Sequence, residues 1–114
     1  MTVDDFQRQV FSDAYKSPIC DSPVIESLTK RRIKIHIDLF VGGFLEAYYN
    51  QQTRTVSYAL IRSGRRVYGA DNTGGWHVHP FGDPSAHIPT TEGRAVLFAE
   101  FLNEIDRQID RSGH

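Results

Sequence analysis

A change of hydrophobic period near the middle of the chain constrains the fold more than any other feature. From Ile33 the apolar residues recur at every second position through Leu39, which is typical of a strand with one buried face. Similar segments follow at about 44–50, 54–61 and 65–71, separated only by short turns. Because parallel pairing needs a long crossover, these turns predict a four-stranded antiparallel meander between residues 33 and 71.

Apolar residues recur at helical spacing in the sequence before and after this meander. Residues 2–15 carry apolar side chains three to four positions apart, and Thr2 with Asp5 resembles an N-terminal capping box. Residues from about 91 to 110 repeat the same spacing, which predicts an amphipathic helix packed on one face of the sheet. Residues 24–30 fit either a short helix or a strand. The expected fold is α+β, in a single domain of residues 1–114 with an N-terminal and a C-terminal helix.

Composition narrows the classes of function. A hydrophobic content of 39% with 24% charged residues is typical of a globular chain, and no apolar run is long enough to span a membrane. Since the first residues also lack the pattern of a signal peptide, we expect a cytoplasmic protein without membrane partners. A net charge of -1 gives no global attraction to nucleic acid, but basic clusters at 30–34 and 62–66 leave room for local phosphate contacts. The single cysteine, Cys20, is expected to be structural.

The segment 71–89 contains three of the five histidines and the only tryptophan. Imidazole changes charge near neutral pH, so His77, His79 and His87 could hold a metal or move protons, with Asp71 as an acidic neighbour. His77 and His79 project to the same side of an extended backbone, and His87 can return through the turn that precedes it. Glycines in this segment allow backbone angles that other residues avoid and prolines restrict φ, which predicts an ordered functional loop.

Two chemistries remain open for this histidine cluster. Three histidines, or two histidines with a carboxylate, suit zinc or another divalent transition ion, although the spacing matches no specific zinc motif. A metal-free site would use two imidazoles as base and acid in RNA cleavage, with Arg65 or Arg66 stabilising the charge on phosphorus. We expect the metal-free alternative, in which the three histidines and Asp71 are catalytic.

Side chains near the cluster suggest supporting roles. Trp76 or Tyr68 could stack on a base, whereas Trp76 and Phe81 could instead be core residues that anchor the loop. Three further polar residues share the second face of the first predicted hairpin: His36, Asp38 and Glu46. If that face lies under the histidine loop, the carboxylates would favour charged imidazoles and fix their tautomers; if it meets solvent, these residues are only a polar surface.

Residues 33–90 follow a recognisable order of features. A strand leads to a glycine-containing turn and Phe44-Leu45-Glu46, further strands end in an aromatic residue before Asp71-Asn72, and a histidine- and proline-rich segment with Phe81 follows. This order resembles the TumE family of small toxins from prokaryotic toxin-antitoxin modules, with this chain as a divergent member. The resemblance implies a toxin that is neutralised by a cognate antitoxin protein and that acts on RNA or translation.

Residues and resemblance together predict a histidine-dependent, ribonuclease-like toxin that needs no cofactor. The alternative is a non-catalytic binding module whose histidine-rich loop holds a divalent metal or a protein partner. Homodimer formation is compatible with both.

Overall fold

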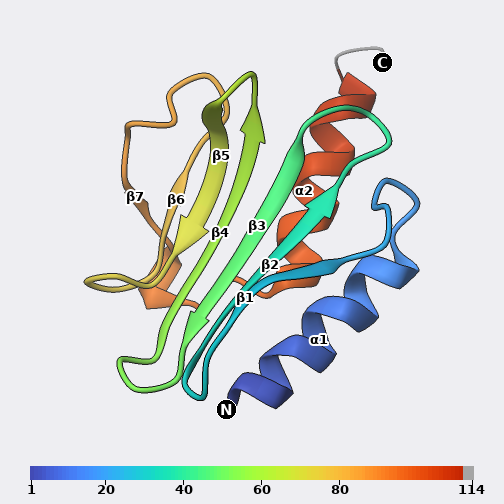
Figure 1. Ribbon diagram of the computed structural model, residues 1–114. Coiled ribbons are helices and arrows are strands. Elements are labelled where there is room, and N and C mark those ends of the chain that lie inside the picture. Colours follow the sequence, from blue (N-terminus) through green and yellow to red (C-terminus); the bar gives the residue numbers. More distant parts are fainter. Residues whose placement is uncertain (112–114) are drawn as a thin grey trace.

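The predicted meander forms the centre of the fold and extends further than the sequence indicated. The computed structural model describes residues 1–111 and contains a seven-stranded antiparallel sheet whose strands lie side by side in sequence order (Figure 1). The strands are β1 (Val24–Leu28), β2 (Arg32–Asp38), β3 (Phe44–Asn50), β4 (Thr55–Arg62), β5 (Arg65–Asp71), β6 (His77–His79) and β7 (Ile88–Pro89). The predicted number of four strands is therefore wrong, although β2 to β5 match the four predicted segments. The terminal His114, which the sequence suggests is mobile, lies outside the described residues.

The three additional strands come from segments that show no clear period of two. β6 has three residues and β7 has two, and both lie in the segment that the sequence predicts as a loop. The ambiguous segment at 24–30 forms β1, which pairs with β2 across a bulge between Ile25 and Ser27. Pairing with an existing neighbour satisfies the backbone hydrogen bonds of these strands, so local pattern is a weak guide to them.

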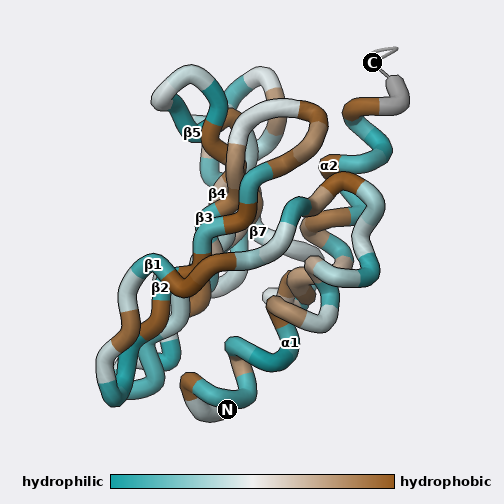
Figure 2. The backbone as a smooth tube through the Cα atoms, turned by 45° about the vertical axis from the view of Figure 1, so that its right-hand side comes forward, coloured by the Kyte–Doolittle hydropathy of each residue, from teal (hydrophilic) through white to brown (hydrophobic). Residues whose placement is uncertain are grey.

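Both helices, α1 (Val3–Lys16) and α2 (Phe98–Arg111), cover the same face of the sheet (Figures 1 and 2). Phe6 of α1 stacks on Tyr49 with 5.2 Å between ring centroids, and Phe101 of α2 lies 5.4 Å from Tyr58 on the same face. Fully burying a side chain of this size contributes roughly 1.5–3 kcal/mol, so these contacts between the helices and the sheet stabilise the fold. The capping box predicted at Thr2 is present and starts α1.

The C-terminal helix begins later than its periodicity predicts. Residues 91–93 form a short 3-10 turn in which Glu92 has a φ of 55°, so the chain cannot enter an α-helix there. The helix starts at Phe98, where the Glu100 carboxylate accepts hydrogen bonds from the Leu97 backbone N–H and from Arg94. These bonds, led by the one from Leu97, lower the pKa of Glu100. Within residues 1–111, neither helix has the length and hydropathy needed to cross a membrane.

Candidate active site

Strand pairing brings the histidines and Asp71 to the face of the sheet opposite the helices. On β5 and β6, His77 lies opposite Asp71 and His79 lies opposite Gly69. Residues directly opposite in a sheet share a face, and the intervening pair, Ala70 and Val78, points towards the helices. We call Asp71, His77, His79 and His87 the histidine cluster.

Asp71 is the centre of this cluster because its carboxylate contacts two imidazoles. Its Oδ1 lies 3.1 Å from His77 Nε2, and its Oδ2 accepts a hydrogen bond from His79 Nε2 at 2.9 Å. Oδ1 also accepts a bond from the Thr73 backbone N–H at 3.1 Å. The Asp71 side chain is only 15% exposed, so these contacts are shielded from water and hold both rings in place.

The two ring nitrogens of His77 each face an acceptor. Its Nδ1 lies 3.0 Å from the Gly75 carbonyl oxygen and its Nε2 lies 3.1 Å from the Asp71 carboxylate. A carbonyl only accepts, so Nδ1 donates the first of these bonds. Gly75 and Asp71 thus hold the imidazole of His77 in place.

His79 is the most buried member of the cluster, with an exposed side-chain fraction of 2%. Its Nε2 donates to Asp71, which leaves Nδ1 with the lone pair of a neutral ring. Nδ1 is buried and has no hydrogen-bond partner in the described part of the chain. Buried polar atoms without a partner are uncommon in proteins, so this atom distinguishes the cluster from an ordinary surface group of histidines.

His87 completes the cluster from the segment just before β7. Its ring centroid lies 4.5 Å from that of His79 and 4.9 Å from that of His77, and its side chain is exposed. The two rings that can reach a bound molecule are thus His87 and the partly exposed His77. The sequence predicted that His77 and His79 project to the same side of the backbone; of the two, His79 is buried and His77 is partly exposed.

Arg66 lies beside the cluster because of an irregularity in β5. The pairing of β4 and β5 shifts by one residue between Leu60 and Ile61, which places Arg66 on the same face as Gly69. A Cβ at Gly69 would lie 3.2 Å from Arg66 Cδ and 3.5 Å from His79 Cδ2, so both side chains occupy the space above this glycine. The Arg66 Nη2 donates to the Pro84 carbonyl at 3.1 Å and ties β5 to the loop before His87.

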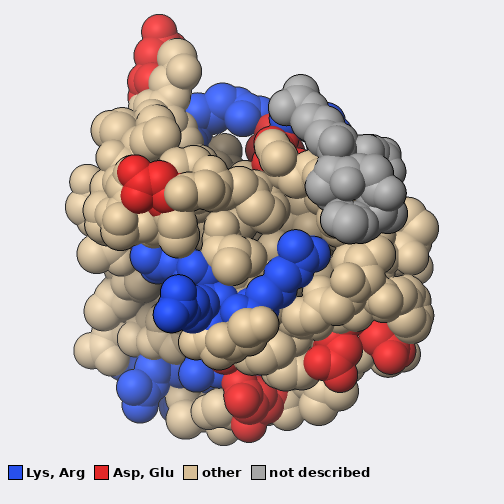
Figure 3. All heavy atoms as spheres, turned by 90° about the horizontal axis from the view of Figure 1, so that it is seen from above, with Lys and Arg blue, Asp and Glu red and all other residues tan. Residues whose placement is uncertain are grey.

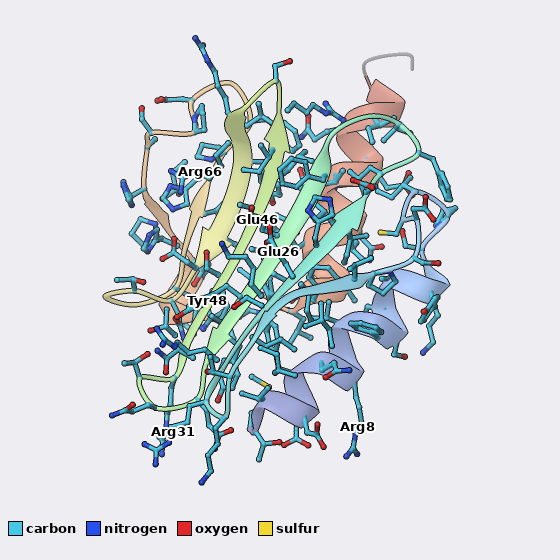
Figure 4. The ribbon with its side chains drawn as sticks, viewed as in Figure 1. Arg8, Glu26, Arg31, Glu46, Tyr48 and Arg66 are labelled. Carbon is cyan, nitrogen blue, oxygen red and sulfur yellow. The ribbon has the colours of Figure 1, made fainter. Side chains whose placement is uncertain are left out.

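Figure 4 shows Arg66 on β5, with Glu46 and Tyr48 on the neighbouring part of the open face. Strand pairing sets Tyr48 opposite Ser57, and Ser57 opposite Asp71. Ser57, a small residue, therefore lies between the cluster and Tyr48. Sequence reasoning missed Gly69, although a glycine inside a strand is a known sign of close approach by another group.

The two aromatic residues expected to stack on a base lie on the helix side of the sheet instead. Tyr68 is buried between Phe81 at 4.4 Å and Phe101 at 4.9 Å. Trp76 packs on the core, with its ring centroid 6.3 Å from that of Tyr58. The alternative that Trp76 and Phe81 anchor the loop is therefore the one that the contacts support.

The predicted supporting residues share the open face but not the histidine cluster. His36 contacts the Asp38 carboxylate at 2.8 Å and stacks on Phe44 at 4.5 Å. It lies on β2, four strands from β6, which corresponds to about 19 Å. Glu46 lies on β3 between them. Arg65 is exposed at the start of β5, where it pairs with Arg62 beside the β4–β5 turn.

Comparisons of the chain with protein-family models, with curated proteins and with solved structures find no match. The geometry of the histidine cluster is thus the basis for a functional conclusion.

Proposed function

We propose that the histidine cluster is a metal-free acid-base site that cleaves RNA. The observation that carries this proposal is the Asp71 carboxylate shared by two imidazoles, with acceptors at both nitrogens of His77. This arrangement holds the His77 imidazole next to the exposed His87 imidazole, with 4.9 Å between the ring centroids. A positioned donor and acceptor at that separation are what proton transfer at one phosphate requires.

The reaction uses the ribose 2'-hydroxyl as the nucleophile. His87 takes the 2'-hydroxyl proton as the oxygen attacks phosphorus. His77 gives the proton on Nε2, the nitrogen that faces Asp71, to the leaving 5'-oxygen as the bond between that oxygen and phosphorus breaks. The products are a 2',3'-cyclic phosphate and a 5'-hydroxyl. Asp71 and His79 are positioning residues, because they orient His77 and do not reach the phosphate themselves.

Arg66 supplies positive charge next to the reacting phosphate. Its side chain is exposed and lies over Gly69, beside His79. Viewed from above, Lys and Arg side chains gather at the end of the sheet that carries the β4–β5 turn with Arg62 and Arg65 (Figure 3). This local basic surface offers phosphate contacts that the net charge of -1 does not suggest.

The resemblance to TumE-like toxins supports a biological setting for this chemistry. We propose that the protein is a toxin whose RNA cleavage stops growth and that a cognate antitoxin protein neutralises it. The residue-level chemistry and this setting are separable, because an enzyme could cleave RNA without an antitoxin.

Site-directed variants test the proposal. His77→Ala and His87→Ala should each remove most of a general acid-base contribution of roughly 10² to 10⁴ in the rate of RNA cleavage. His36→Ala is the matched control, because His36 also pairs with an aspartate on the open face but lies far from the cluster. Cleaved RNA should end in 2',3'-cyclic phosphate, and expression of wild type but not of the two cluster variants should inhibit growth.

Two results contradict this proposal. The first is cleavage by His77→Ala and His87→Ala at the wild-type rate, with circular dichroism showing intact folds. The second is an absence of RNA cleavage by the wild type together with equal growth inhibition by wild type and variants, which would favour a binding module.

A divalent transition ion is the second candidate for the same residues. The donor atoms of His77, His79 and His87 lie within 4.8 Å of one another, and His79 Nδ1 has a free lone pair. Tetrahedral zinc needs nitrogens at about 2.0–2.1 Å from the ion, so the rings would have to close in and His77 would lose a present contact. For this reason we rank metal binding second to acid-base chemistry in our proposal.

Elemental analysis of protein purified without chelators separates the two candidates. We expect less than one transition ion per chain and cleavage that survives a chelator. Stoichiometric zinc that is lost in His77→Ala would instead establish the metal site.

A further inference from the structure

One register of strand pairing runs across the open face of the sheet, from the histidine cluster towards the opposite edge. The residues paired along it are, in order, His77, Asp71, Ser57, Tyr48, Lys34 and Ser27. We propose that Tyr48 and Lys34 form a second RNA subsite, which binds a further nucleotide of the single strand that is cleaved at the cluster. This inference rests on the proposed function, because it takes RNA to be the molecule at the cluster.

Strand spacing sets the distance between the cluster and this subsite. Tyr48 lies on β3, three strands from His77 on β6, which corresponds to about 14 Å, and Lys34 lies one strand further. Between Tyr48 and Asp71 stands Ser57, whose small side chain leaves room for an RNA strand above it. Both helices cover the other face of the sheet, so no helix within residues 1–111 lies over this path (Figure 1).

The ring of Tyr48 is available for stacking. Alternation along β3 places Tyr48 on the open face, where it is partly buried, while Tyr49 packs under α1. Phe44, on the same face of β3, already stacks on His36, whereas the Tyr48 ring contacts no other aromatic ring in the part of the chain that the structure describes. A partly exposed ring on an open sheet is a surface on which a nucleobase stacks.

A hollow of about 220 Å³ lies beside this ring, and it is lined by Ser27, Thr29, Arg32, Ile33, Lys34 and Tyr48. It combines an aromatic ring, two aliphatic hydroxyls and two cations, with no carboxylate in its lining. A second hollow of about 440 Å³ shares Thr29 and Arg32 with the first and adds Lys30 and Arg31, again without a carboxylate. Hollows of this composition suit the phosphate and base of a nucleotide and disfavour a cationic ligand.

The cations of residues 30–34 are free to contact phosphate, because none of them forms an ion pair with a carboxylate within residues 1–111. Two carboxylates lie in the same region: Glu26 in the β1 bulge, and Glu46 two residues before Tyr48. Neither lines the hollows. Figure 4 shows Glu46 and Arg31 on opposite sides of Tyr48, so we expect the phosphates of the strand to follow the basic side.

Binding of an RNA that cannot be cleaved tests the subsite separately from catalysis. A fluorescein-labelled single strand of about six 2'-O-methyl nucleotides lacks the attacking hydroxyl, and fluorescence anisotropy measures its affinity. Tyr48→Ala should weaken binding about tenfold, whereas Tyr48→Phe, which keeps the ring, should stay within about twofold of wild type. Lys34→Ala should weaken binding and reduce the slope of log affinity against log salt concentration by about 0.7, which corresponds to one phosphate contact.

Two matched controls come from α1, which covers the other face of the sheet. Tyr15→Ala and Lys16→Ala remove an exposed ring and an exposed cation, and both variants should keep the wild-type affinity. A duplex of the same sequence should bind at least about tenfold more weakly than the single strand, because its bases stack on one another and cannot reach Tyr48. Circular dichroism confirms that each variant folds.

Four results would overturn the subsite: no saturable binding of the single strand by wild type, unchanged affinity in Tyr48→Ala, unchanged affinity in Lys34→Ala, or equal binding of the duplex. None of them contradicts cleavage that depends on His77 and His87. Conversely, binding that depends on Tyr48 and Lys34, without cleavage of unmodified RNA by wild type, would support the subsite and contradict the acid-base proposal.

Discussion

Replacing Asp71 with asparagine tests the hydrogen-bond accounting at the histidine cluster. The amide oxygen can still accept from His77 and from the Thr73 N–H, but the amide nitrogen replaces the oxygen that accepts from His79 Nε2. His79 must then move its proton to Nδ1, which is buried and has no acceptor. A buried donor without a partner costs about 1–3 kcal/mol, and the loss of the negative charge that faces both imidazoles adds about 1 kcal/mol.

We therefore expect Asp71→Asn to lower the free energy of unfolding by about 2–4 kcal/mol. Urea unfolding at pH 7, followed by far-UV circular dichroism, measures this difference. Long-range ¹⁵N NMR of the imidazoles provides a second measurement, since His79 should carry its proton on Nε2 in the wild type and on Nδ1 in the variant. RNA cleavage should fall along with the tautomer change, because His77 loses its orienting carboxylate.

Asp38→Asn is the control, because it changes the same group beside a histidine on the same face. Asp38 is 68% exposed and His36 is 29% exposed, so their ion pair is screened by water and contributes about 0–1 kcal/mol. The accounting is refuted if the two variants lose equal stability, or if Asp71→Asn keeps wild-type stability and the wild-type tautomer of His79.

Three further predictions concern the core. Phe101→Ala should lower the free energy of unfolding in urea by about 3–5 kcal/mol, because the ring is fully buried. Leu97→Ala is the control: its side chain is 60% exposed, so the loss should be less than about 1 kcal/mol. Equal losses would contradict the packing of α2. Burial raises the pKa of Tyr68 to about 12. The neutral phenol therefore stabilises the fold below pH 10, and this stabilisation should be lost as the pH rises from 10 to 12. Phenolate absorbance should report the titration, and Tyr68→Phe should lose less stability over the same pH range. Burial also raises the pKa of the Cys20 thiol, so a thiol reagent should react slowly with the native protein and rapidly once denaturant is added. Rapid labelling of the native protein would contradict the burial of Cys20.

The sequence was a good guide where a regular period repeats over many residues. The alternation from Ile33 and the short turns predicted β2 to β5 and their antiparallel order, and the capping box at Thr2 predicted where α1 begins. It was a poor guide at β6, β7 and the start of α2. A strand of two or three residues has no period to detect, and the turn at Glu92 depends on a backbone conformation that its residue type does not favour.

For the candidate site, the sequence predicted the grouping of His77, His79 and His87 with Asp71, because close spacing and extended backbone limit where these side chains can lie. It could not determine which imidazole is covered. The burial of His79 and the exposure of His87 follow from the pairing of β6 with its two neighbours, which depends on contacts between distant residues.

The amino-acid sequence by itself determined which residues share a face of the sheet, since alternation is a local property of a strand. Only the tertiary structure decided which face the helices cover, and that choice placed Tyr68 and Trp76 in the core and left Asp71 and the histidines on the open face. It also decided the position of Arg66, through a one-residue shift in strand pairing. The physical reason is that both outcomes depend on packing between elements, and packing energy belongs to the assembled fold and not to any segment of it.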